Sequence, residues 1–212
     1  MKKTLIIVLS LVLVVVMTVA GTMAYLTDKT EEVKNTFTVG SIFVPDDPDD
    51  PDDDIALELK EHGIKDDNND GKYEFDLTTE TIGNKYKVLP GVALPKDPFI
   101  RTNRDTEMAA YLFLEVVDET SDALSFTVDP DNWTKLYDAT ETRGAIYYYK
   151  TTGIVPADTK APLTVNILKD QAITVSNVEI TNPGEVSFLG YMIQAGGFDT
   201  PAAAWAGLNP TT

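Results

Sequence analysis

The chain has 212 residues with 34 acidic and 17 basic side chains, a formal net charge of −17, and no cysteine. The missing thiols exclude a disulfide framework, a thiolate zinc site and a cysteine nucleophile. A net charge of this sign repels nucleic acid and anionic lipid, so neither is expected as a partner of the exported chain.

The first residues have the pattern of a secretory signal. Two lysines precede an apolar run over residues 5–20, and small residues follow that run. This order predicts a signal peptide over residues 1–24, cleaved between Ala24 and Tyr25. The alternative is an uncleaved anchor, because the uncharged residues 4–27 are also long enough to cross a bilayer about 30 Å thick.

Residues 25–44 form a β-prone segment directly after the signal. β-Branched and aromatic side chains in its second half favour a strand with a break at Gly40. Residues 45–54 consist only of proline and aspartate, which cannot build a packed core, and predict an extended tether with a reach of about 35 Å. We interpret residues 25–44 as a candidate donor strand with the apolar residues Phe37, Val39, Ile42 and Phe43.

A tethered strand of this kind needs a sheet edge that can pair with its backbone groups. The edge can belong to the body of the same chain or to a neighbouring copy. Pairing between copies is head to tail, does not close, and yields filaments. Insertion into its own body, as an ordinary first strand, is the alternative that the sequence leaves open.

Residues 55–212 are predicted to form one β-sandwich domain, large enough for its own core. The segments that begin at Ile55 and Tyr73 alternate apolar and polar side chains, which is typical of half-buried strands and places Leu77 on an inner face. Residues 108–117 are almost continuously apolar and predict a central strand. Further strands are predicted at residues 124–128, 145–150, 163–168, 172–180 and 186–194.

Two local patterns complete the predicted domain. The apolar phase changes near Ser176, which indicates a β-bulge within the strand 172–180. Near the end of the chain, Thr200 can cap a helix, Pro201 suits its first position, and Gly207 suits its end. Many short strands separated by turn residues predict an all-β antiparallel sandwich with a short C-terminal helix.

The sequence also offers a candidate calcium site. Asp66, Asn68, Asp70 and Gly71 have the order of the first half of a calcium-binding loop, in which alternate oxygen ligands converge before a sharp turn. The twelfth position is Leu77 instead of the usual bidentate glutamate. The alternative is a hairpin turn, which the same residue types favour. We therefore expect no cofactor, with Ca²⁺ as the one possible ligand that the sequence indicates.

Catalytic patterns are weak, and we expect no enzyme and no catalytic residue. The single histidine, His62, has no second histidine with which to form a zinc site or a relay, and we expect it in an exposed loop. Trp133, Tyr137 and residues 147–149 could form a glycan-binding face. Aromatic residues at strand spacing more often pack in the core and across strands, which is the interpretation preferred here.

Several short motifs together resemble the TasA and camelysin-like family, whose members are processed by a SipW-type signal peptidase. They lie at both ends and in the middle of the chain: residues 21–28 (Gly-Thr-Met-Ala-Tyr-Leu-Thr-Asp), 35–40 (Asn-Thr-Phe-Thr-Val-Gly), 89–92 (Leu-Pro-Gly-Val), 96–98 (Lys-Asp-Pro), 103 (Asn), 191–195 (Tyr-Met-Ile-Gln-Ala), 198–199 (Phe-Asp) and 204–205 (Ala-Trp). The resemblance implies a jelly-roll-like sandwich and export from a Gram-positive cell. It also implies biofilm-matrix fibres in which one subunit's N-terminal strand completes the next subunit's sheet. The aspartate and proline tether departs from the family pattern.

The expected function is that of a secreted structural protein that assembles with copies of itself into extracellular fibres by donor-strand complementation. Its other expected partner is the signal peptidase, and it meets the membrane only before the signal is removed. The alternative is a monomeric cell-surface binding module for calcium or glycan. A fibre subunit grows in size with concentration, whereas a binding module stays monomeric and responds to its ligand.

Amino-terminal sequencing of the exported protein is expected to begin at Tyr25, because the small residues before it suit a signal peptidase. A membrane-bound product that keeps residues 1–24 would contradict this cleavage site and support the uncleaved anchor.

Overall fold

The computed structural model describes Ile42 and residues 56–208. The chain divides into two compact units, Met1–Val39 and Gly40–Thr212, and every described residue belongs to the second unit. The predicted signal peptide, its cleavage site, and the donor-strand residues Phe37, Val39 and Phe43 lie outside the described residues.

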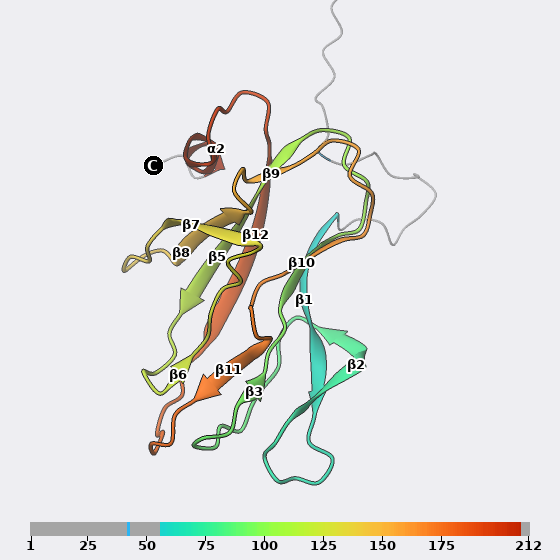
Figure 1. Cartoon of the computed structure of the whole chain (residues 1–212). Coiled ribbons are helices and arrows are strands. Elements are labelled where there is room, and N and C mark those ends of the chain that lie inside the picture. The colour runs from blue at the N-terminus through green and yellow to red at the C-terminus, as the bar shows by residue number, and fades with distance from the viewer. Residues whose placement is uncertain (1–41, 43–55, 209–212) are drawn as a thin grey trace, which may run out of the picture. The chain divides into compact units, whose positions relative to one another are not determined.

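The described part of the second unit consists of antiparallel strands and one short helix (Figure 1). The described elements are β1 (Leu57–Lys65), β2 (Glu74–Thr81), β3 (Leu94–Pro95), β4 (Phe99–Thr102), β5 (Ala110–Asp118), β6 (Leu124–Ser125), β7 (Trp133–Tyr137), β8 (Ala145–Tyr149), β9 (Ile154–Val155), β10 (Leu163–Asn166), β11 (Ala172–Val175), β12 (Val186–Gln194) and α2 (Pro201–Leu208). This confirms the predicted all-β, sandwich-like fold with a short C-terminal helix.

The strands form three sheets. The first has the order β10-β4-β1-β2, the second has the order β3-β11-β6, and the third has the order β12-β5-β8-β7 with β9 paired to β5. The main core lies between the first and third sheets. Ile100 of β4 packs there with Leu112 and Leu114 of β5, and all three side chains are at most 1% exposed.

β5 is the central strand that its continuous apolar sequence predicts. It pairs with β12 on one edge and with β8 and β9 on the other. Alternate side chains point to opposite faces: Leu112 and Leu114 enter the main core, whereas Tyr111 and Phe113 enter a second apolar cluster under α2. A strand buried on both faces needs apolar residues at every position, which explains the unbroken run.

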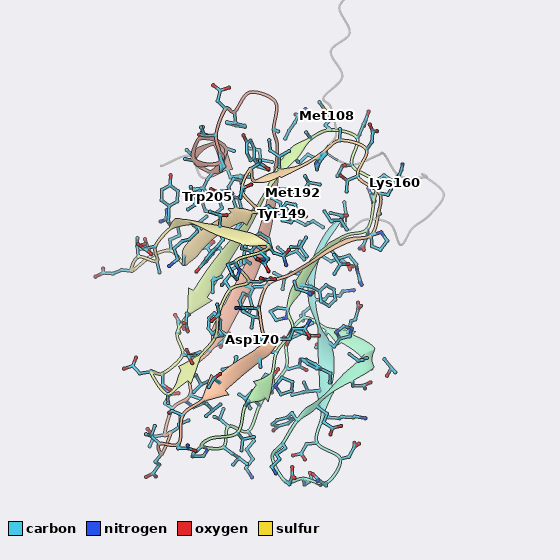
Figure 2. All side chains as sticks on the ribbon, viewed as in Figure 1. Met108, Tyr149, Lys160, Asp170, Met192 and Trp205 are labelled. Atoms are coloured by element: carbon cyan, nitrogen blue, oxygen red, sulfur yellow. The ribbon has the colours of Figure 1, made fainter. Side chains whose placement is uncertain are left out.

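Helix α2 covers the outer face of the third sheet. The Thr200 hydroxyl accepts a hydrogen bond from the Ala203 N–H at 3.2 Å, as expected of a capping residue. Trp205, labelled in Figure 2, packs edge-on against Phe113 and Tyr191 with ring centroids 5.4 and 5.3 Å away. The predicted helix is confirmed, and its apolar anchor is Trp205. No helix within the described residues is long and apolar enough to span a membrane.

Two details of the predicted strands are wrong. The strand expected at 172–180 ends at Val175 and contains no bulge. The Ser176 N–H donates to the Ala123 carbonyl and its carbonyl accepts from the Gly91 N–H, which extends the registers with β6 and β3 to Ser176. The strand ends there because its partner strands β3 and β6 are only two residues long. Leu77 is 70% exposed. Its strand, β2, lies at the edge of its sheet, so the alternating pattern there does not correspond to a buried face.

Replacing Trp205 with alanine is expected to lower the free energy of unfolding by about 3–5 kcal/mol, because the cavity left over Phe113 cannot collapse fully. Denaturant titration followed by circular dichroism measures the change. Leu189→Ala is the matched control, since Leu189 is 41% exposed on the same sheet and should change stability by about 1 kcal/mol or less. Equal effects of the two substitutions would show that α2 is not anchored through Trp205.

Candidate functional site

β12 lies at the end of the third sheet, so one of its two edges has no neighbouring strand among the described residues. β12 pairs with β5 over its whole length. Just beyond the paired residues, the Glu119 N–H donates a hydrogen bond to the Glu185 carbonyl at 2.9 Å. Because hydrogen-bonded pairs alternate along an antiparallel ladder, the odd-numbered residues of β12 are the ones bonded to β5. No strand of the described part pairs with the other edge. We call it the free edge of β12; its outward backbone groups belong to Val186, Phe188, Gly190, Met192 and Gln194.

Gly190 sits where the two main sheets approach most closely along this strand. A β-carbon at this position would lie 3.0 Å from the Ile100 side chain and 3.9 Å from that of Leu57. The absent side chain therefore allows β12 to contact the strands β1 and β4 directly. On the Val186 side of this contact a space remains between the sheets.

That space is a half-open cavity of about 590 Å³. It lies between β1, β3, β11 and the first residues of β12, and it opens beside the free edge. Its walls combine the apolar side chains Leu59, Leu94, Ile173, Val186 and Phe188 with polar ones such as Glu61, Asn84 and Lys96. Val186 and Phe188 also direct their backbone groups to the free edge, so the cavity and the unpaired edge form one continuous surface.

One wall of the cavity carries a buried ion pair. The Lys96 ammonium lies 2.6 Å from the Glu61 carboxylate, and the two side chains are 9% and 3% exposed. The second Glu61 oxygen accepts a hydrogen bond from the Asn84 N–H at 2.6 Å. Lys96 also lies 5.9 Å from the ring centroid of Phe188. The pair ties β1 to the residues between β3 and β4, and it places a cation beside the cavity.

Tyr86 adds a polar group to the same wall. Its hydroxyl donates a hydrogen bond to the Pro95 carbonyl at 2.6 Å. Burial, followed by the nearby Glu61 and Asp97 carboxylates, raises the pKa of the Tyr86 phenol well above its ordinary value. The phenol therefore stays neutral and remains a hydrogen-bond donor throughout the physiological pH range.

His62 is not the exposed loop residue expected from the sequence. It lies in β1 with 28% of its side chain exposed. Its Nδ1 is 2.6 Å from Asp97 Oδ2, and its N–H donates to Asp97 Oδ1 at 3.1 Å. Lys96 and Asp97 are neighbours between β3 and β4, and Glu61 and His62 are neighbours in β1. The Lys96–Glu61 and Asp97–His62 pairs together hold this segment to β1.

The candidate calcium loop is the hairpin connection between β1 and β2. The Asp66 carboxylate accepts hydrogen bonds from the N–H groups of Asp70 and Gly71, at 3.1 and 2.9 Å. Asn68 and Asp70 also bond to each other. The structure thus brings the three predicted ligands Asp66, Asn68 and Asp70 together as a turn. Within the described part of the chain no group of three or more His, Asp or Glu side chains is arranged to hold a metal ion. Calcium binding stays a prediction.

The aromatic residues considered for glycan binding mostly serve the core. Trp133 and Tyr149 are 3% and 7% exposed and pack edge-on at 6.2 Å. The Trp133 indole donates a hydrogen bond to the Asn166 carbonyl at 2.9 Å. Tyr137 is 36% exposed at the edge of its sheet. The preferred interpretation, core and cross-strand packing, is confirmed for Trp133 and Tyr149.

Ile42, the described residue of the candidate donor strand, is held by the body. Its carbonyl accepts hydrogen bonds from the N–H groups of Glu107 and Met108, at 2.9 and 3.4 Å. The Ala56 carbonyl accepts one from the Asn103 N–H at 3.0 Å. Ile42 and Ala56 are therefore both bonded to the connection between β4 and β5.

This anchor and the cavity lie toward opposite ends of β5. Met108 precedes the first residue of β5, near the upper end of the view in Figure 2. The cavity adjoins Val186, which pairs with Asp118, the last residue of β5, near the lower strands β3, β6 and β11 in Figure 1. Ile42 is therefore bonded near one end of β5, and the cavity lies near the other.

Sequence reasoning missed the Glu61–Lys96 pair. One signal was present: in the alternation of Leu57 and Leu59, the next inward position is Glu61, and a charge on the inner face of a strand requires a buried partner. The partner could not be named, since Lys96 is distant in the sequence.

Comparisons with protein-family models, with curated proteins and with solved structures found no match for this chain. Its function is therefore argued from its sequence and geometry.

Replacing Lys96 with methionine is expected to lower the free energy of unfolding by about 3–5 kcal/mol, because the Glu61 carboxylate is left buried without its cation. Glu61→Gln in the same chain should recover most of that loss. Lys160→Met is the matched control: Lys160 is 78% exposed in its pair with Asp105, and an exposed pair contributes at most about 1 kcal/mol. Denaturant unfolding of the four proteins decides between these outcomes. An effect of Lys96→Met no larger than that of the control would contradict a structural role for the pair.

Proposed function

We propose that this chain is an exported, non-enzymatic structural protein that assembles into extracellular biofilm-matrix fibres by donor-strand complementation. In this proposal, the part of the candidate donor strand 25–44 that precedes the Ile42 anchor, residues 25–41, pairs in one copy with the free edge of β12 in the next copy. The observation that carries it is that β12 is long, apolar and paired on one side within the described part of the chain.

β12 differs from the other edge strands in ways that favour pairing. Its nine residues, VSFLGYMIQ, include no charge and no proline, whereas proteins usually protect an exposed edge with charge, proline or short length. β2 carries Glu74, Asp76 and Glu80, while β7 and β10 have only five and four residues. Among the described edges, β12 is therefore the one best suited to accept a strand.

The anchor at Ile42 supports head-to-tail growth. Ile42, which follows the donor segment in the chain, is bonded near the Ala110 end of β5, while the cavity beside β12 lies near the Asp118 end. A donor at one end and an acceptor at the other form a heterologous contact that generates an open filament when the rotation between subunits does not close a ring. The net charge of −17 opposes nonspecific association, so that directed strand pairing is the contact that holds copies together.

The remaining parts of the proposal rest on the residues described above. Export is supported by the basic, apolar and small residues of positions 1–24. A structural role is supported by the buried polar side chains, since Glu61 with Lys96 and His62 with Asp97 connect β1 to the chain between β3 and β4. The extracellular setting also fits a cysteine-free, acidic surface.

Deleting residues 25–41 from the exported chain is expected to abolish filaments while leaving the unfolding midpoint within a few degrees of the intact protein. The physical reason is that the deletion removes the donor and keeps Ile42 and the described body. Electron microscopy and light scattering at increasing concentration measure assembly, and circular dichroism measures folding.

A free peptide of residues 25–41 is the complementary experiment. It should occupy the free edge of β12 and stop the growth of intact protein, whereas a peptide of the same composition in scrambled order should not. Filaments from the deleted chain, or an intact chain that stays monomeric at every concentration, would contradict strand donation and leave the monomeric binding module as the better interpretation.

A further inference from the structure

We infer that the cavity between β1, β3 and the start of β12 is the receptor for the side chains of Phe37 and Val39 from a second copy of this chain. This inference rests on the proposed strand donation, and it adds which residues enter the acceptor and where.

The donor sequence has one face that suits the cavity. From residue 33 to residue 39, the odd positions are Val33, Asn35, Phe37 and Val39, and the even positions are Lys34, Thr36 and Thr38. Successive side chains of a strand point to opposite faces. One face is therefore mainly apolar, and the other is polar and suited to solvent.

The acceptor has the matching geometry. Val186 and Phe188 direct backbone groups to the free edge, while their side chains pack toward the main core and line the cavity. A strand added to this edge continues the sheet, so every second side chain of the new strand enters the space between the sheets. That space is bounded by Leu59, Leu94 and Ile173, which suits aromatic and β-branched side chains.

The chain's own Phe37 falls short of this cavity. Ile42 is bonded to Met108, and the run of β5 from Met108 to Val116, the partner of Phe188, is about 26 Å at ~3.3 Å per residue. The chain from Ile42 back to Phe37 spans at most about 18 Å. Val39 lies closer still to the anchor. We therefore assign the Phe37 and Val39 side chains in this cavity to a second copy.

Lys96 provides a polar contact for the backbone of the incoming strand. An ammonium group has three N–H donors, and among the described residues the Lys96 ammonium pairs with the Glu61 carboxylate, 2.6 Å away. The ammonium lies beside the Phe188 ring at the cavity wall. It can donate to a carbonyl of the second copy at the point where that strand covers the cavity.

Substituting the donor residues tests which face is buried. Phe37→Ala in the full exported chain should raise the concentration needed for filament growth at least about tenfold, the loss expected when a buried aromatic side chain is removed. Thr38→Ala, on the opposite face, is the matched control and should change that concentration less than about threefold. Equal effects of the two substitutions would overturn the assignment of the inner face.

Disulfide trapping tests the location, and the cysteine-free chain makes each bond unambiguous. One protein carries Val186→Cys at the cavity, and a second carries a single donor substitution: Phe37→Cys or Val39→Cys on the inner face, Thr36→Cys or Thr38→Cys on the outer face. Each donor protein is mixed with the Val186→Cys protein, and the filaments are oxidised mildly. A disulfide-linked dimer should form with Phe37→Cys or Val39→Cys, and should not form with Thr36→Cys or Thr38→Cys.

The outcomes separate this inference from the proposed function. Filaments in which all four donor proteins or none of them form a bond to Val186→Cys would overturn the cavity assignment and leave strand donation intact. A monomer with both Val39→Cys and Val186→Cys that closes an internal disulfide would place the chain's own segment in the cavity and also overturn it. Absence of filaments from the unsubstituted chain would instead contradict the proposed function.

Discussion

A strand that pairs along one edge leaves half of its backbone hydrogen-bonding groups directed at whatever lies beside it. β12 is in this position: its odd-numbered residues bond to β5, and its even-numbered residues direct N–H and C=O groups to the free edge. Buried backbone groups without partners are costly, so an edge strand flanked by an apolar cavity is stable only while water or another strand reaches it. The proposed assembly follows from that requirement.

The surrounding structure keeps this edge open. β5 fixes β12 from one side, Trp205 holds its outer face through Tyr191, and Gly190 brings it against Ile100 and Leu57. These contacts make β12 a rigid template. The Glu61–Lys96 pair holds β1 to the chain between β3 and β4 on the far wall of the cavity, so the walls are fixed before a partner arrives. Pre-organised surfaces lose less entropy on binding.

Much of the fold could be predicted because its strongest signals are local. The continuous apolar run predicted β5, and residues 186–194 were predicted as a strand with the bounds that β12 has. The capping pattern predicted α2. The end of β11 was missed because its partners β3 and β6 are two-residue strands distant in the sequence, and no local pattern reports where they end. Leu77 was misplaced because alternation alone cannot tell an edge strand from a half-buried one.

The candidate site was less predictable, since it is made of relations between distant residues. Phe37 and Val39 could be recognised as one face of a strand, but the cavity depends on the separation of two sheets. The anchor of Ile42 on Glu107 and Met108 could not be foreseen either, because the sequence suggested that residues 45–54 let the segment move freely. That anchor limits how far Phe37 and Val39 can lie from Met108 in their own molecule.

Amide hydrogen exchange of β12, compared between monomer and filament, tests the central claim most directly. The odd-numbered amides are bonded to β5 and should be protected in both states. The even-numbered amides of Val186, Phe188, Gly190, Met192 and Gln194 should exchange quickly in the monomer and become protected, by at least about a hundredfold, in the filament. Filaments in which the even-numbered amides still exchange as quickly as in the monomer would contradict assembly through the free edge of β12.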